Sequence, residues 1–316
     1  MGQRLALVGF AALLLPFVLP AQDTPAPAPA PAKAKPQVYD AKADAKADVA
    51  AAVARAKRDH KRVIVQIGAN WCGWCVLLHE KLHQDRALAA TLKAEFEYVL
   101  VDVGRMDKNM DLVAKYGVEL KSIPYLLVLD GDDKVVVRQP TEPLEEGKAH
   151  SSAAIAKFLD AHKAPPVDAA KVVADALARA KAEDKLVFLH FGAPWCGWCH
   201  RLEDWMASPT VAPVLARQFV DCKVDIDRMT GGKDVQKKWR TGDGGGIPWF
   251  SFVDGAGATK VTSDGPKGNV GFPAKADEIE HFVTMLKTAA TKLDADAIAL
   301  LAKSLEPKPV PPAKEK

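Results

Sequence analysis

Two cysteine pairs with identical spacing are the residues most able to do chemistry in this sequence. Cys72-Gly-Trp-Cys75 and Cys196-Gly-Trp-Cys199 each follow a run of β-branched and apolar residues and precede residues with helical periodicity. The first cysteine of each pair is therefore expected at a helix N-terminus, where the helix dipole and unpaired N–H groups favour the thiolate. The three-residue spacing lets the second thiol approach the first. Each pair can thus exchange disulfides through a mixed disulfide, with Cys72 or Cys196 attacking and Cys75 or Cys199 resolving.

These pairs belong to a long internal repeat. Cys72 corresponds to Cys196 and Pro124 to Pro248, a constant spacing of 124 residues, and each Ile-Pro follows its first cysteine by 52 residues. A repeat of this length indicates a duplicated domain, because solenoid units run about 20 to 50 residues.

Each unit shows the same order of expected elements. The pattern predicts a helix (about 43–60; about 168–183), a strand into the cysteines, a long helix and a second strand (96–103; 219–226). A helix, a hairpin turning at Asp-Gly and a closing helix follow. Pro209 and Pro213 are expected to break the long helix of the second unit, and the first unit lacks them.

The order of strand, Trp-Cys-x-x-Cys, helix and later Ile-Pro resembles the thioredoxin superfamily. The resemblance covers about residues 40–162 and 165–291. It implies an α/β fold of two tandem thioredoxin-like domains, each a central mixed sheet flanked by helices, in the layout of two-site disulfide isomerases. It also implies cis prolines that face the dithiols and backbone that pairs with a substrate chain as an added strand. The residues expected to contact substrate are Trp71, Trp74, Ile123, Pro124, Trp195, Trp198, Ile247 and Pro248.

Two positions depart from the family pattern on the buried side of the dithiols. Gln66 and His190 stand six residues before the first cysteine, where such domains often carry a buried acid. Gln66 cannot titrate, whereas His190 could transfer a proton to or from Cys199 if it lies beneath that thiol. A hydrogen-bonded core histidine is the alternative. Lys223 is expected near His190.

Trp74 and Trp198 are a second departure, because thioredoxins carry proline and disulfide isomerases histidine between the cysteines. Tryptophan supplies neither a fixed φ nor a charge. The motif therefore leaves the direction of electron flow open among reductant, isomerase and oxidant.

The N-terminal residues suggest export. Residues 1–21 combine one arginine with an apolar run that Pro16 and Pro20 interrupt, which is typical of a secretory signal peptide. A retained anchor is the alternative, although the run is shorter than the ~20 apolar residues of a spanning helix. The expected order is then a Pro/Ala-rich disordered linker (22–39), domain 1 (40–164), domain 2 (165–304) and a disordered tail (305–316). We expect a periplasmic or secreted protein.

Composition and charge limit the classes of partner and cofactor that we expect. The net charge of +3 comes from interspersed residues of both signs, so nucleic acid is not an expected partner. Cys222, in a predicted strand, is expected to be a buried, inert thiol. No metal or cofactor is expected, because a dithiol carries electrons itself. A zinc site is disfavoured by the 121 residues between Cys75 and Cys196.

The sequence therefore predicts an exported thiol-disulfide oxidoreductase that acts on protein or peptide disulfides. A dithiol electron donor or acceptor is the expected redox partner, and a membrane-embedded protein is one candidate for it. Two alternatives stay open. One is a redox-inactive peptide-binding or chaperone-like module with structural disulfides. The other is c-type haem attachment at Cys196, Cys199 and His200, against which the first copy has Val76 in place of the histidine.

Overall fold

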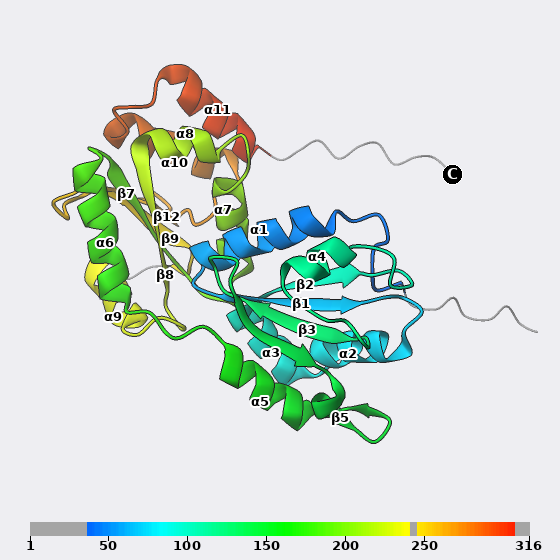
Figure 1. Cartoon of the computed structure of the whole chain (residues 1–316). Helices are drawn as coiled ribbons and strands as arrows, with labels where there is room; N and C mark the ends of the chain where they lie inside the picture. Colours follow the sequence, from blue (N-terminus) through cyan, green and yellow to red (C-terminus); the bar gives the residue numbers. More distant parts are fainter. Residues whose placement is uncertain (1–36, 241–244, 307–316) are drawn as a thin grey trace, which may run out of the picture. The chain divides into compact units, whose positions relative to one another are not determined.

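The computed structural model describes residues 37–240 and 245–306, which belong to one compact unit (Figure 1). The predicted signal peptide, most of the predicted linker and nearly all of the predicted tail lie outside the described residues. Among the described helices, none has the length and apolar character needed to cross a bilayer.

The first domain is a four-stranded sheet with helices on both faces. Its elements are α1 (Ala45–Arg58), β1 (Arg62–Gly68), α2 (Gly73–Gln84), α3 (Arg86–Glu95), β2 (Phe96–Asp102), α4 (Met110–Lys115), β3 (Tyr125–Leu129), β4 (Val135–Pro140), the 3-10 helix η1 (Glu142–Leu144), β5 (Glu145–Glu146), β6 (Ala149–His150) and α5 (Ser152–His162). The strand order is β2-β1-β3-β4. Strands β1 and β2 are parallel, while β3 pairs antiparallel with β1 and β4.

The second domain repeats this plan. Its elements are α6 (Ala169–Ala182), β7 (Leu186–Gly192), α7 (Gly197–Met206), α8 (Ala212–Gln218), β8 (Phe219–Asp225), α9 (Gly232–Trp239), β9 (Trp249–Val253), β10 (Thr259–Thr262), β11 (Asp264–Gly265), β12 (Gly268–Asn269), α10 (Ala276–Ala289) and α11 (Ala295–Leu305). The strand order is β10-β9-β7-β8, with β7 and β8 parallel and β9 antiparallel to β7 and β10. The predicted fold class is confirmed.

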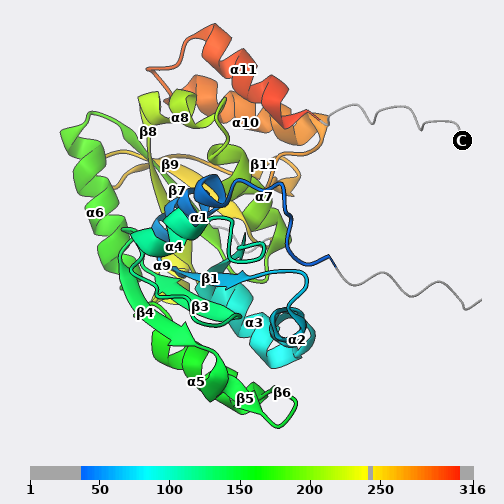
Figure 2. The same ribbon diagram turned by 45° about the vertical axis from the view of Figure 1, so that its right-hand side comes forward.

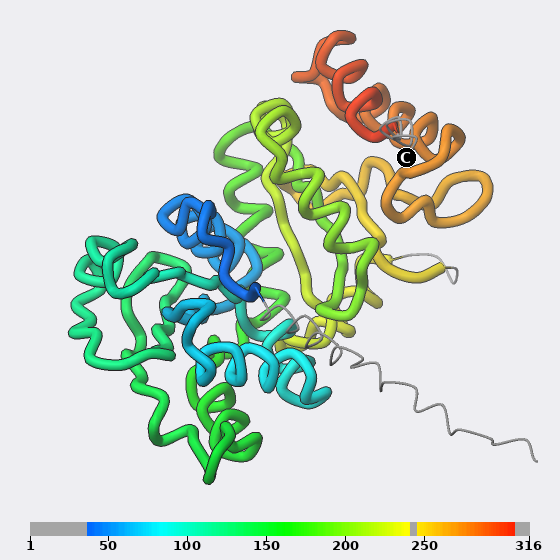
Figure 3. The backbone as a smooth tube through the Cα atoms, turned by 90° about the vertical axis from the view of Figure 1, so that its right-hand side faces the viewer, coloured from blue at the N-terminus to red at the C-terminus, as the bar shows by residue number. Residues whose placement is uncertain are grey.

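Helices cover both faces of each sheet and enclose two cores per domain. In the first domain α1 and α4 lie on one face, and α2, α3 and α5 on the other (Figures 1 and 2). In the second domain α6 and α9 cover one face, and α7, α8, α10 and α11 the other. Figure 3 shows α10 and α11 side by side at the end of the described chain, in orange and red. Because both faces are covered, the central strands β1 and β7 are buried almost throughout.

The structure corrects the expected break in the dithiol helices. The second unit breaks between α7 and α8, as expected, but the first unit also breaks, at Asp85. The side chain of Asp85 accepts hydrogen bonds from the backbone N–H groups of Ala87 and Leu88. Capping by an aspartate starts a new helix without any proline.

The predicted linker and tail each extend too far into the folded chain. Tyr39, placed at the end of the linker, is 2% exposed, and Oδ1 of Asn70 accepts hydrogen bonds from the N–H groups of Val38 and Tyr39, both at 2.8 Å. Leu305, placed in the tail, ends α11 and is buried. Tyr39 stands alone beside a proline-rich stretch and gives no periodic signal, whereas Leu305 continues the helical spacing of Leu301 and belongs to the closing helix.

Candidate functional site

Both cysteine pairs stand at helix N-termini. Cys72 is the N-cap of α2 and Cys196 the N-cap of α7, and each is disulfide-bonded to the second cysteine of its pair with Cα atoms 5.3 Å apart. In each pair Sγ of the first cysteine lies 3.1 Å from the backbone N of the second and accepts its hydrogen bond. After reduction the same N–H group and the helix dipole favour a thiolate on the first sulfur.

The two cysteines of a pair differ in burial. Cys72 and Cys196 are 7% and 5% exposed, whereas Cys75 and Cys199 are 0% and 1% exposed. The first cysteine of each pair is therefore the more exposed one. This arrangement suits attack by the first cysteine and resolution by the second.

The Ile-Pro pairs face the dithiols. The Ile123–Pro124 and Ile247–Pro248 peptide bonds are both cis, as the resemblance implied. Sγ of Cys72 lies 3.5 Å from the carbonyl oxygen of Ile123, and Sγ of Cys196 lies 3.5 Å from that of Ile247. Segments 51 residues apart are thus brought together at each site.

Three of the four motif tryptophans are exposed around the cysteines. Trp71, Trp195 and Trp198 are 52%, 66% and 51% exposed. Trp74 is half-buried, with its ring edge-on to His150 at a centroid distance of 5.2 Å. The two sites therefore present different aromatic surfaces.

A groove adjoins the second dithiol. Its volume is about 310 Å³, and its lining includes Trp198, Ile247, Pro248 and Phe272. The rings of Trp198 and Phe272 stack at 6.2 Å, and the guanidinium of Arg201 lies over both. Three of the residues predicted to contact substrate thus line one concave surface.

The buried side of the first dithiol is an uncharged hydrogen-bond network. Nε2 of Gln66 donates to the hydroxyl of Tyr39 at 2.6 Å and to the carbonyl oxygen of Cys75 at 3.0 Å. The hydroxyl of Tyr98 donates to Oε1 of Gln66 at 2.7 Å, and Nδ1 of His79 lies 3.3 Å from that hydroxyl. Burial, with a smaller effect from neighbouring His83, lowers the pKa of His79 to about 4, so this ring is neutral at pH 7.

The second site carries charged groups in the equivalent places. His190 is buried, with Nε2 2.9 Å from Oδ1 of Asp221, and it pairs across the sheet with Lys223. The expected proximity of Lys223 and His190 is therefore confirmed.

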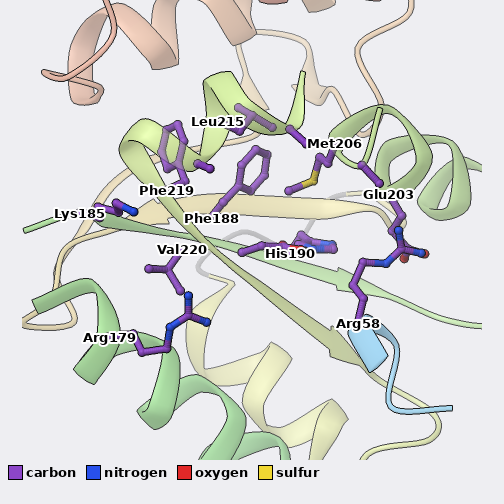
Figure 4. Close-up of a pocket in the computed structure, with 14 residues that line it drawn as sticks. Arg58, Arg179, Lys185, Phe188, His190, Glu203, Met206, Leu215, Phe219 and Val220 are labelled. Atoms are coloured by element: carbon purple, nitrogen blue, oxygen red, sulfur yellow. Dashed lines mark hydrogen bonds and ion pairs between the residues drawn. The ribbon is translucent and has the colours of Figure 1, made fainter. Parts of the chain in front are cut away.

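Sequence reasoning missed Glu203, which is 3% exposed and lines the same pocket as His190 (Figure 4). Burial raises its pKa, but the contact with His200 and the charge of Lys223 outweigh burial and hold the pKa below its usual range. The available signal was the position of Glu203 four residues after Cys199, which puts both on one helix face.

Two further expectations concern Cys222 and the haem alternative. Cys222 is buried and free, and burial raises the pKa of its thiol to about 12, as expected of an inert thiol.

Nε2 of His200 lies 2.9 Å from the carbonyl oxygen of Pro194 and Nδ1 lies 3.4 Å from Oε2 of Glu203. Both ring nitrogens thus face protein groups, which disfavours an axial haem ligand. No cluster of three or more metal-ligating side chains occurs within residues 37–240 and 245–306.

Two family models match successive parts of the chain. A model described as "Thioredoxin-like" (Thioredoxin_7) matches residues 44–131. A model described as "Protein of unknown function, DUF255" (Thioredox_DsbH) matches residues 149–250. Each match includes the strand and helix that carry one dithiol.

Curated relatives carry disulfide isomerase names. The chain is 25% identical over 222 residues to the protein disulfide-isomerase of Hordeum vulgare and 26% identical over 225 residues to the protein disulfide-isomerase tigA of Aspergillus niger. Each alignment covers 67% of this chain, but the chain spans only 39% and 57% of those relatives. Among solved structures, a disulphide isomerase from Xylella fastidiosa Temecula1 is 33% identical, with 40% of this chain and 96% of that chain covered and a TM-score of 0.37.

Each half of the chain thus matches its own family model over the elements that present its dithiol. The chain belongs to the thioredoxin superfamily and carries two thioredoxin-like domains in a disulfide isomerase-like layout.

Proposed function

We propose that the protein is an exported thiol-disulfide oxidoreductase that acts on protein disulfides at both dithiols. The observation that carries this proposal is the placement of Cys72 and Cys196 as N-caps, each accepting a backbone hydrogen bond at its sulfur, with a fully buried second cysteine behind. A stabilised thiolate that borders solvent is the nucleophile that disulfide exchange requires.

The exchange proceeds in two balanced steps. In the reduced protein the thiolate of Cys72 or Cys196 attacks a substrate disulfide, and one substrate sulfur leaves as a thiolate. Cys75 or Cys199 then loses its proton and attacks the first cysteine, which releases the second substrate sulfur. The substrate gains two electrons and becomes a dithiol, while the protein dithiol becomes a disulfide; the reverse sequence oxidises a substrate dithiol.

Protein substrates are supported by the surface beside the sulfurs. The exposed Trp71, Trp195 and Trp198 offer flat apolar contacts, and the groove at Ile247 runs along main chain that can pair with an extended peptide. The names of the curated relatives agree with such substrates. Turnover also needs a second dithiol or disulfide protein that restores the starting redox state. Export is supported by the sequence of residues 1–21.

The test is the reduction potential of each pair. The mature protein is equilibrated in glutathione buffers, and the two disulfides are quantified separately by mass spectrometry. A value near about −270 mV would indicate a reductant and one near about −120 mV an oxidant, with isomerases between them. If neither pair changes redox state in these buffers, the dithiols are structural and the oxidoreductase proposal fails.

A further inference from the structure

The groove beside the second dithiol has a positive charge at its edge. The rings of Trp198 and Phe272, which line the groove, stack with their centroids 6.2 Å apart. The guanidinium carbon of Arg201 lies 4.8 Å from the centroid of the Trp198 ring and 5.1 Å from that of the Phe272 ring. Arg201 belongs to the second turn of α7, the helix that Cys196 caps. These two rings and the guanidinium are called the Arg201 clamp below.

The Arg201 clamp holds the guanidinium without using its hydrogen-bond donors. A guanidinium that stacks on aromatic rings is held by its flat surface, so its N–H groups stay free in the plane. Arg201 is exposed, and across residues 37–240 and 245–306 its side chain forms no hydrogen bond and no ion pair. The donors are therefore available to a ligand, and the stacked side chain loses less conformational entropy when a ligand binds.

The other charges that line the groove cancel one another. Lys275 and Glu278 pair at 3.2 Å, and the Glu278 carboxylate also accepts hydrogen bonds from the N–H groups of Ala274 and Lys275 at the start of α10. Asp204, three residues after Arg201 on α7, forms no ion pair with it. Arg201 thus supplies an unbalanced positive charge. A carboxylate complements it best, because the planar guanidinium can donate two parallel hydrogen bonds to the two carboxylate oxygens.

The first dithiol has no counterpart of this charge. In the 124-residue repeat Leu77 stands where the second unit has Arg201, and Leu77 is 42% exposed. The ring of Trp74 lies edge-on to His150 and has no stacked arginine. Burial lowers the pKa of His150, so that ring is neutral at pH 7. The two sites therefore offer a substrate different surfaces, an apolar one at the first dithiol and a cationic one at the second.

We propose that the second dithiol selects peptide disulfides with an aspartate or glutamate close to the reacting cysteine, and that Arg201 binds this carboxylate. This inference rests on the proposed function, because it names a substrate class for the same site. A peptide bonded to Cys196 and extended along Ile247 enters the groove beside the Arg201 clamp. The disulfide exchange follows the steps given above. Arg201 takes no part in them and acts as a specificity residue.

The experiment compares three peptides in the full chain. Cys72→Ser and Cys75→Ser remove the first dithiol and give the parent protein, which is then reduced. Each peptide has one cysteine in a disulfide with thiopyridine, a neutral leaving group, and the residues beside that cysteine are aspartate, asparagine or lysine. Absorbance of the released thiopyridine gives the rate constant for attack by Cys196. Division by the rate constant for mercaptoethanol removes differences in the intrinsic reactivity of the peptides.

The normalised rates should follow the charge of the peptide. The parent should react about three- to fivefold faster with the aspartate peptide than with the asparagine peptide, and more slowly with the lysine peptide. This preference should shrink as salt is added. Arg201→Leu, which copies the first unit, should abolish it. Arg201→Lys should retain only part of it, because an ammonium group keeps the charge and loses the planar geometry.

Two controls separate the Arg201 clamp from the overall charge. Arg217→Leu removes the same charge from the same domain, at a residue that pairs with Asp294 at 3.1 Å and does not line the groove, so the preference should stay at the parent level. The second control retains only the first dithiol, through Cys196→Ser and Cys199→Ser. It should react with the aspartate and asparagine peptides at equal normalised rates, because Leu77 replaces the guanidinium there.

Several outcomes would overturn the inference and leave the proposed function intact. These are equal normalised rates with all three peptides in the parent, equal loss of preference in Arg201→Leu and Arg217→Leu, or the same aspartate preference at the first dithiol. If the parent releases no thiopyridine from any peptide, the proposed function itself fails at this site. If circular dichroism shows that Arg201→Leu is unfolded, Arg201→Gln takes its place: loss of the preference supports the inference, and retention contradicts it.

Discussion

The two dithiol sites of this chain are alike around the first sulfur, called the front here, and differ on the buried side, called the back. At the front, each pair of cysteines starts a helix, each first sulfur lies 3.5 Å from an isoleucine carbonyl oxygen, and each second cysteine is buried. At the back, the first site has Gln66 among tyrosine hydroxyls, whereas the second has Glu203 on Lys223. Main-chain geometry can therefore stay constant while the proton chemistry of the buried sulfur changes.

The origin of the buried groups explains this difference. The first site is completed by Tyr39, from the segment before α1 of its own domain, which supplies a hydroxyl. The second site is completed by Asp59 from the other domain, which pairs with Lys223 and supplies a charge. Neutral groups change a thiol pKa mainly through hydrogen bonds, whereas a buried charge acts directly on the thiolate. We expect the two sites to respond differently to pH and to substitution.

The largest expected effect comes from removal of an attacking sulfur. Cys72→Ser and Cys196→Ser should each reduce peptide-disulfide exchange at the altered site by about 10³-fold or more, because the hydroxyl is a far weaker nucleophile at neutral pH. Separate assays of each single variant would check this. Retained activity at the other site means independent dithiols, and loss at both sites would show that electrons pass from one dithiol to the other.

A charge placed behind the first dithiol should make the electrostatic surroundings of its buried thiol more like those of the second dithiol. Gln66→Glu puts a carboxylate beneath Cys75, and it should raise the pKa of the Cys75 thiol by about one unit, since a nearby negative charge disfavours the thiolate. Alkylation of Cys75 against pH in a Cys72→Ser background measures this pKa. Gln66→Met is the control, because it removes the hydrogen bonds and adds no charge. Identical titrations of Gln66→Glu and the parent would contradict the electrostatic comparison.

The aromatic surfaces should also differ in their contribution to binding. Trp198→Ala removes half of the ring pair in the groove and should raise KM for a peptide disulfide at the second site by about five- to tenfold, with kcat little changed. Trp74→Ala should have a smaller effect at the first site, because Trp74 packs against His150. Steady-state kinetics of single-site proteins would compare them. An equal rise in KM at both sites would remove this distinction.

The smallest expected effect is a pH-dependent contribution to stability from His200. The contact with Glu203 raises the pKa of His200, so its stabilisation is fully present below the unfolded histidine pKa of about 6.5 and is lost as pH rises through the folded value. His200→Gln should therefore lower the free energy of unfolding by less than about 1 kcal/mol at low pH, and the difference should vanish at higher pH. Urea unfolding over a pH series measures this, and a difference that grows with pH would show the opposite sign.

Much of the fold could be predicted because its signals are local or repeated. The helix around Ala45–Arg58, the strand into Cys72 and the hairpin at Asp130-Gly131 each follow from periodicity or turn chemistry. The break at Asp85 contains no proline, so proline positions did not predict it; here aspartate at an N-cap starts a new helix.

The residues of the candidate site also fall into two groups, those that the sequence reveals and those that it does not. The cysteines and the Ile-Pro pairs could be recognised because they stand at fixed spacing in both units. Glu203, Tyr39 and Asp59 could not be recognised as site residues, since each resembles an ordinary residue of its own segment. Their contacts with Gln66 and Lys223 join positions 20 to 164 residues apart, and no local pattern encodes such pairs.

The sequence by itself determined the two domains and the placement of each dithiol at a helix N-terminus, and it predicts that the first sulfur of each pair attacks. Residue type, spacing and repetition suffice for those conclusions, because they depend on main-chain geometry that nearby residues dictate. Only the tertiary structure decided what lies behind each buried sulfur: hydroxyls and an amide at Cys75, and carboxylates sharing a lysine at Cys199. That distinction depends on which distant side chains packing brings together, and in a low-dielectric interior those neighbours govern the proton affinity of the thiol.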